Sequence, residues 1–155
     1  MTERDSKARI VVGVDGSDQS KEALRWAARL AEALNAKIDA MIVWDVPDYT
    51  YNGWNYDAAG WHPEQAAADQ LDNTLEEVFG KTRPAGLRQL TRRGNAAKEL
   101  INAAADARML VVGSRGHGGF AGLLLGSVSA HCAAHATCPV LVTHCHKTAS
   151  TAAGR

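Results

Sequence analysis

Features that mark secreted, membrane or disulfide-stabilised proteins are scarce in this sequence. Its 155 residues include three cysteines, Cys132, Cys138 and Cys145, an odd number that does not suit a disulfide framework and fits a reduced compartment. No apolar run approaches the roughly 20 residues that span a bilayer, and the polar opening MTERDSKAR contains no secretory apolar core. We therefore expect a cytoplasmic protein that does not enter a membrane.

Net charge and two well-known motifs are also missing. The 17 basic and 17 acidic residues cancel, so bulk charge gives no reason to expect nucleic acid or an anionic membrane as a partner. The P-loop pattern GxxxxGK(S/T) and the hydrolase pattern GxSxG do not occur. The run from Gly116 to Ala121 satisfies GxGxxA, but it follows a late strand and lacks the acidic residue that a dinucleotide site requires.

Hydrophobic patterns predict an alternation of strands and helices. Ala23, Leu24, Ala27, Leu30, Ala31 and Leu34 recur at helical spacing in a helix that Asp18 could cap. A second helix begins at Pro63 and ends at Gly80, a third begins near Asn95, and a fourth begins near Ser127. Four short apolar runs predict strands buried on both faces, and Leu87–Arg92 predicts a poorly covered edge strand: Ile10–Val14, Ile38–Trp44, Met109–Val112 and Val140–Thr143. This order predicts an α/β fold with a parallel sheet and helices on both faces.

The length predicts one domain, over residues 9–146. Residues 1–8 are expected to form a flexible N-terminus and residues 147–155 a disordered tail. Residues 45–62 form a connection longer than usual, with Tyr49, Tyr51, Trp54, Tyr56 and Trp61. These aromatic residues could form a lid over a ligand or a patch for a partner, or could simply pack onto their own domain.

A glycine-rich segment joins the strand at Met109–Val112 to the last helix. Glycine allows positive φ and lets backbone amides converge on an anion, and a helix N-terminus adds further donors. Arg115 supplies a cation, and the hydroxyls of Ser127 and Ser129 could donate to phosphate. The segment therefore predicts a phosphate cradle, although glycines can also serve only as a tight connection.

The spacing in this segment resembles the universal stress protein family. The ATP-binding members of that family carry G-x2-G-x9-G-(S/T), and here the pattern is complete as Gly113, Gly116, Gly126 and Ser127. The opening VVGVDGSDQS is similar to the start of family members, and the resemblance extends from about Ile10 to Thr143. It implies a single-domain member with a Rossmann-like fold of the adenine nucleotide alpha hydrolase type. It also implies an open five-stranded parallel sheet in the order 3-2-1-4-5.

The resemblance also implies a site at the carboxyl ends of strands one and four. Gly13 and Asp15 would lie against the ribose and adenine, Asp15 would also approach a phosphate-bound Mg²⁺, and Val43 would meet the base. As an alternative, Asp15 caps the first helix. His117, partly charged near neutral pH, is expected to contact phosphate, so that affinity rises as pH falls from about 8 to 6. The ribose and phosphates would be wrapped by Gly113, Ser114, Arg115, Gly116, His117, Gly118 and Gly119. The phosphates would be covered by Gly126, Ser127 and Val128.

Catalytic and metal sites are not favoured by the pattern. Several histidines and cysteines near the end of the chain have no clear four-ligand arrangement, namely His131, His135, Cys138, His144, Cys145 and His146. No nucleophile, base or acid pair stands out, so we expect no catalytic residue. The leading hypothesis is an ATP-binding stress-response module that forms a homodimer through Val140–Thr143. Slow ATP hydrolysis, self-phosphorylation, binding of AMP or cyclic AMP, and a nucleotide-free interaction protein remain alternatives.

Overall fold

The computed structural model describes residues 8–45, 60, 62–115 and 125–145. Five parallel strands form one sheet in the order β3-β2-β1-β4-β5, as expected. The predicted N-terminal tail apart from Ala8, the predicted C-terminal tail and nearly all of the aromatic connection lie outside the described residues, as do Gly116, His117, Gly118 and Gly119.

Within the described residues, nine elements follow the predicted alternation, with small shifts at their ends. The first strand ends at Gly13 rather than Val14, and the edge strand is displaced by one residue. In chain order the elements are β1 (Arg9–Gly13), α2 (Asp18–Leu34), β2 (Lys37–Trp44), α3 (Pro63–Phe79), β3 (Arg88–Arg93), α4 (Ala96–Ala103), β4 (Met109–Gly113), α5 (Ser127–His135) and β5 (Val140–Thr143).

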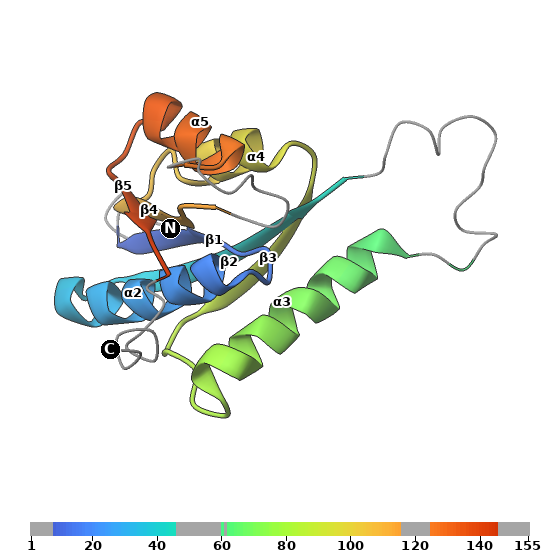
Figure 1. Ribbon diagram of the computed structural model, residues 1–155. Helices are drawn as coiled ribbons and strands as arrows, with labels where there is room; N and C mark the ends of the chain where they lie inside the picture. The colour runs from blue at the N-terminus through green and yellow to red at the C-terminus, as the bar shows by residue number, and fades with distance from the viewer. Residues whose placement is uncertain (1–7, 46–59, 61, 116–124, 146–155) are drawn as a thin grey trace, which may run out of the picture.

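Helices cover both faces of the sheet, in the three layers that Figure 1 shows. Because side chains alternate along a strand, Ile10 and Val12 pack on the α2 and α3 side, whereas Val11 packs on the α4 and α5 side. Two hydrophobic cores result, one on each face. This explains why the central strands are continuous apolar runs rather than alternating ones.

Helix ends mostly confirm the sequence predictions, with one correction. Asn95 caps α4 by accepting from the amide of Lys98, and Gly80 ends α3 with a positive φ. The cap of α2, however, is Ser17 rather than Asp18, because the Ser17 hydroxyl accepts from the amide of Ser20 at 3.2 Å. Asp18 is instead the first helical residue, where a negative charge suits the helix dipole.

An acidic residue within the sheet was not anticipated. Asp39 on β2 is 5% exposed and lies between Val11 on β1 and Arg88 on β3 in the strand register. Its carboxylate accepts from Nε of Arg9 at 2.7 Å and from Nε and Nη2 of Arg88, each at 2.8 Å. Burial raises the pKa of Asp39, but these hydrogen bonds and charges outweigh burial and hold the pKa below its ordinary value.

Candidate functional site

A pocket lies at the carboxyl ends of β1 and β4, which are neighbours in the sheet. The connection after β1 leads to α2 on one face, and the connection after β4 leads to α5 on the other. This divergence is the switch point where open α/β sheets bind ligands. The cavity measures about 210 Å³ and is lined by Gly13, Val14, Asp15, Ser17, Ser20, Met41, Val43, Ala96, Leu100, Val112, Gly113, Arg115, Gly126, Ser127, Val128 and Ser129.

Most of the predicted residues that the structure describes line this pocket. Eight of them do so: Gly13, Asp15, Val43, Gly113, Arg115, Gly126, Ser127 and Val128. Ser114 does not, because it is buried and its backbone is used internally. Its amide donates to the carbonyl of Thr143 at 2.7 Å, and its carbonyl accepts from the amide of Gly126 at 2.6 Å. Ser114 thus fixes the start of α5 relative to β4.

The walls of the pocket differ in chemistry. Met41, Val43 and Leu100 contribute apolar side chains to the lining. Arg115 and the exposed Ser127 add a cation and a hydroxyl to the lining. Ligand sites commonly pair an apolar surface with a few placed polar groups, so the pocket suits a molecule with an apolar ring and an anionic tail.

The N-terminus of α5 faces this pocket through Gly126, Ser127 and Val128. Gly126 is the N-cap and provides no side chain to accept from the first helical amides. Such amides, with the positive end of the helix dipole, are suited to an anion. Ser129 is used differently from the expectation, since its buried hydroxyl donates to the carbonyl of Ser114 at 2.8 Å.

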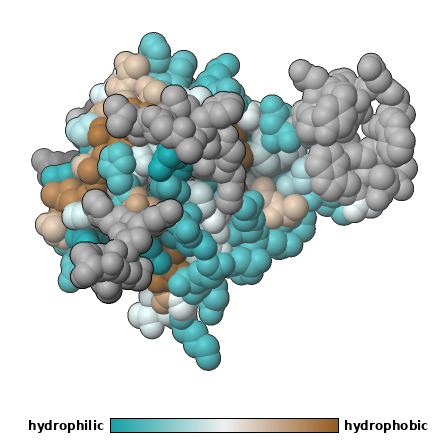
Figure 2. Space-filling model, in the orientation of Figure 1, coloured by the Kyte–Doolittle hydropathy of each residue, from teal (hydrophilic) through white to brown (hydrophobic). Residues whose placement is uncertain are grey.

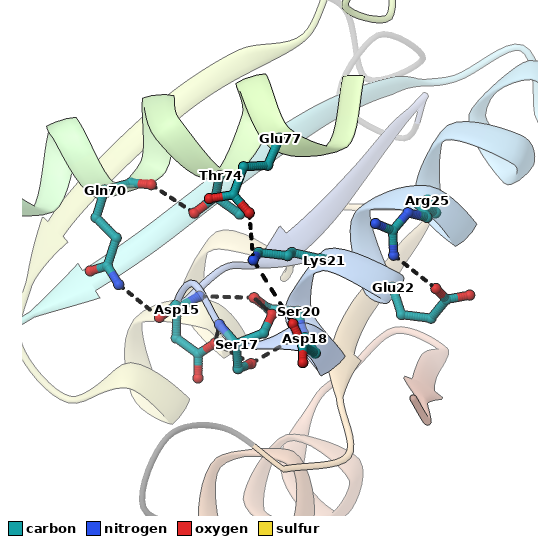
Figure 3. A network of polar contacts seen from close by, with 10 residues as sticks. All are labelled: Asp15, Ser17, Asp18, Ser20, Lys21, Glu22, Arg25, Gln70, Thr74 and Glu77. Atoms are coloured by element: carbon teal, nitrogen blue, oxygen red, sulfur yellow. Dashed lines mark hydrogen bonds and ion pairs between the residues drawn. The ribbon is translucent and has the colours of Figure 1, made fainter. Parts of the chain in front are cut away.

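Asp15 belongs both to the pocket wall and to the turn that begins α2. Its Oδ1 accepts from the amide of Ser17 at 2.9 Å and from the Ser17 hydroxyl. Its amide in turn donates to the Ser20 hydroxyl at 3.3 Å, as Figure 3 shows. Asp15 therefore supports the helix cap, which the sequence offered as an alternative, while remaining part of the pocket lining.

Gly113 is needed for a reason that the sequence did not reveal. A Cβ at this position would lie 2.6 Å from Cβ of Gln19 and 2.9 Å from its carbonyl carbon. The backbone of α2 thus packs directly on the end of β4. The first glycine of the predicted cradle permits close helix–strand packing, in addition to any contact with a ligand.

The histidines and cysteines do not gather into a metal site within the part of the chain that the structure describes. No group of three or more potential ligands occurs there, and the rings of His131 and His135 simply lie 4.4 Å apart. Burial, with a smaller effect of Cys138, raises the pKa of Cys132 to about 11. Cys132 therefore stays protonated and unreactive near neutral pH. His146 lies outside the described residues.

The sheet order, the helices on both faces and the pocket at the switch point define a Rossmann-like α/β domain. The model of the Universal stress protein family matches residues 8–144, so the chain belongs to that family.

Known proteins place the chain among its relatives. A universal stress protein of Mycolicibacterium smegmatis is 34% identical over 139 residues, covering 87% of this chain and 47% of that protein. The chain spans about half the length of the curated relatives it matches. No helix within the described ranges is long and apolar enough to cross a membrane.

Solved structures agree with the fold. A universal stress protein described as in complex with cAMP is 28% identical, with a TM-score of 0.58, and the match covers 90% of this chain and 98% of that one. The universal stress protein UspA from Lactobacillus plantarum is 21% identical, with a TM-score of 0.71 and coverage of 88% and 97%. The second likeness supports the fold alone.

Proposed function

We propose that the pocket binds an adenine nucleotide, with ATP as the leading candidate. The observation that carries this proposal is that one pocket is lined by apolar side chains, by Arg115 and by the N-terminus of α5, whose N-cap Gly126 has no side chain to occupy the first amides. The adenine would pack on Met41, Val43 and Leu100, and the phosphates would lie toward Arg115 and Ser127. The similar protein described as bound to cAMP supports an adenine nucleotide as the ligand class.

The remaining predicted contacts follow the same arrangement. Gly13 and Asp15 would meet the ribose and adenine, and Gly113 with Gly116, His117, Gly118 and Gly119 would surround the ribose and phosphates, whereas buried Ser114 would support them from behind the pocket wall. A Mg²⁺ ion carried by ATP would find a hard carboxylate oxygen in Asp15, which is the donor type that Mg²⁺ prefers.

We further propose that the single domain, residues 9–146, acts as a cytoplasmic stress-response module in which nucleotide occupancy is the signal. Among the described lining residues, the acids and bases are Asp15 and Arg115. Asp15 is already hydrogen-bonded within the turn before α2. This arrangement supports binding rather than rapid hydrolysis.

Replacing Arg115 with glutamine is expected to raise the Kd for ATP about 10- to 100-fold, because a hydrogen bond to a charged group contributes roughly 1.5–3 kcal/mol. Adenosine, which lacks phosphates, should bind both proteins equally. Isothermal titration calorimetry measures the Kd for ATP and the Kd for adenosine in wild type and in the variant. Arg108→Gln is the matched control, because exposed Arg108 precedes the opposite end of β4 and does not line the pocket. Equal losses for ATP and adenosine would contradict the assignment of Arg115 to phosphate.

Slow hydrolysis or self-phosphorylation is the principal alternative. Phosphate release from the purified protein, compared with Gly116→Val, separates an intrinsic activity from a contaminant, because only intrinsic activity depends on the cradle. Competition of AMP and cyclic AMP with ATP in the same calorimetric experiment distinguishes the preferred nucleotide.

We propose a homodimer in which the edges of β5 from two chains pair. The opposite edge strand, β3, carries Arg88, Arg92 and Arg93 and is protected by charge, whereas β5 is VLVT. Figure 2 shows hydrophobic side chains on the side of the molecule where Figure 1 places β5. Three apolar residues of β5 are only partly buried in the single chain: Val140, Leu141 and Val142.

Leu141→Lys is expected to convert the dimer to a monomer, because it places a charge in the proposed pairing strand. Light scattering after size exclusion measures the mass, and circular dichroism verifies that the variant remains folded. Thr91→Lys introduces the same charge on the other edge strand and should leave the mass unchanged. A folded Leu141→Lys variant that remains dimeric would refute pairing through β5.

A further inference from the structure

Helix α3 contacts the turn that lines the pocket, although α3 itself contributes no residue to the described lining. The Nε2 atom of Gln70 donates to the carbonyl oxygen of Asp15 at 3.0 Å. Figure 3 shows the Gln70 side chain extending from α3 to this turn. The two residues are 55 positions apart, so the contact joins the turn between β1 and α2 to the helix that follows the aromatic connection.

The glycine after Asp15 is fitted to the same contact. Gly16 has a φ of +82°, which favours glycine, and a Cβ there would lie 2.5 Å from Nε2 of Gln70. The backbone therefore passes directly beneath the Gln70 amide. No larger residue could occupy position 16 without displacing Gln70 or the turn.

The opposite side of the turn is also held. The Asp15 carboxylate accepts from Ser17, and the Asp15 amide donates to Ser20. Both of those serines, like Asp15, line the pocket. The turn thus lies between the pocket and Gln70, and the hydrogen bond to Gln70 restrains the one backbone carbonyl that links Asp15 to Gly16.

The helical turn that carries Gln70 is fixed within α3, and an ion pair joins α3 to α2. The buried Thr74 hydroxyl donates to the carbonyl of Gln70 at 2.7 Å. One turn further along, Glu77 pairs with Lys21 of α2 at 2.6 Å. Figure 3 shows that these contacts follow one side of α3 along the start of α2. A displacement of α3 would therefore be transmitted to Asp15.

We propose that Gln70 is a positioning residue for the nucleotide site, coupling α3 to the orientation of Asp15. This inference rests on the proposed function, because it assigns Gln70 an effect on nucleotide affinity without contact with the nucleotide. Since a hydrogen bond contributes on the order of a two- to tenfold change in an equilibrium constant, loss of the Gln70 donor raises the Kd by about that factor. Adenosine is affected as well as ATP, because Asp15 is assigned to the adenosine end.

The test compares Gln70→Met with Gln65→Met. Both glutamines are exposed on α3, but Gln65 donates to Asp69 of the same helix rather than to the turn. Calorimetry with ATP and with adenosine is expected to show a two- to tenfold higher Kd for Gln70→Met only, with the Tm of the ligand-free protein equal to that of the Gln65→Met control. Gln70→Glu, which keeps the length but places a carboxylate against the Asp15 carbonyl, should weaken binding further.

Hydrogen exchange of the ligand-free proteins separates this proposal from the proposed function. The amides of Asp15–Ser17 are expected to exchange faster in Gln70→Met than in wild type or Gln65→Met. Wild-type protein that binds no adenine nucleotide overturns the proposed function. Unchanged exchange, or unchanged affinity in Gln70→Met when wild type binds, overturns the role of Gln70.

Discussion

Gly113→Ala is expected to lower the free energy of unfolding by about 2–3 kcal/mol, near the upper part of the usual range for overpacking. The added Cβ would lie 2.6 Å from Cβ of Gln19, 2.9 Å from its carbonyl carbon and 3.1 Å from its carbonyl oxygen. These are atoms at the base of a helix, so α2 must move as a whole to make room. The same carbonyl accepts from the Thr143 hydroxyl at 3.2 Å, so that contact would be disturbed too.

Gly13→Ala provides the matched control. Gly13 also ends a central strand and lines the pocket, but its new Cβ would meet Cδ1 of Leu100 at 2.9 Å. A flexible side chain can shift where a helix backbone cannot. Urea denaturation followed by circular dichroism should therefore show a clearly smaller loss for Gly13→Ala. Equal losses for the two variants would contradict the packing role of Gly113.

Asp39→Asn is expected to lower the free energy of unfolding by about 3 kcal/mol, because removing one partner of a buried ion pair leaves the other charge uncompensated. This loss is at the low end of the usual range because the Arg88 side chain is 49% exposed and water can solvate its charge. The Arg9 side chain is 13% exposed, so its charge is the one left with little compensation. Losing the carboxylate removes the link that joins β1, β2 and β3. Chemical denaturation at neutral pH measures the change.

The pH dependence gives an independent reading of Asp39. Because its pKa is lower in the folded than in the unfolded chain, it stabilises the fold above its ordinary pKa. That contribution to stability is lost as the pH falls through the lowered pKa that Asp39 has in the folded protein. Wild type should therefore lose more stability than Asp39→Asn on acidification below about pH 4. Parallel pH profiles would contradict the ion-pair account.

Asp72→Asn is the control, because it also removes an aspartate charge that pairs with an arginine, but at an exposed position. Asp72 also pairs with an arginine, Arg83, at 2.8 Å, but its side chain is 60% exposed. Water already solvates this pair, so its removal should change stability little. A loss as large as that of Asp39→Asn would mean that burial is not the source of the effect.

The elements of the fold were largely predictable because their signals are local. Pro63, Gly80 and Asn95 bound helices through backbone restrictions that act over a few residues. The strand order was implied by the family resemblance rather than by hydrophobic patterns. The cap of α2 was misassigned to Asp18 because Ser17 and Asp18 are adjacent and both are residues that cap helices.

The contacts between distant segments could not be predicted. A lone acid in the apolar run KIDAMIVW signals a need for partners, but only the strand register identifies Arg9 and Arg88. Gln70 carries no signal, since an exposed glutamine on a helix is ordinary. Gly113 was correctly singled out, but its packing against Gln19 depends on where α2 crosses β4.

The central claim, an adenine-nucleotide site at the switch point, is tested most directly by native mass spectrometry of the purified protein. The account predicts one adenine nucleotide per chain, either retained through purification or acquired on addition of millimolar ATP with Mg²⁺, and markedly reduced in Arg115→Gln. A measured mass equal to that of the polypeptide alone, both after purification and after addition of ATP with Mg²⁺, would contradict it.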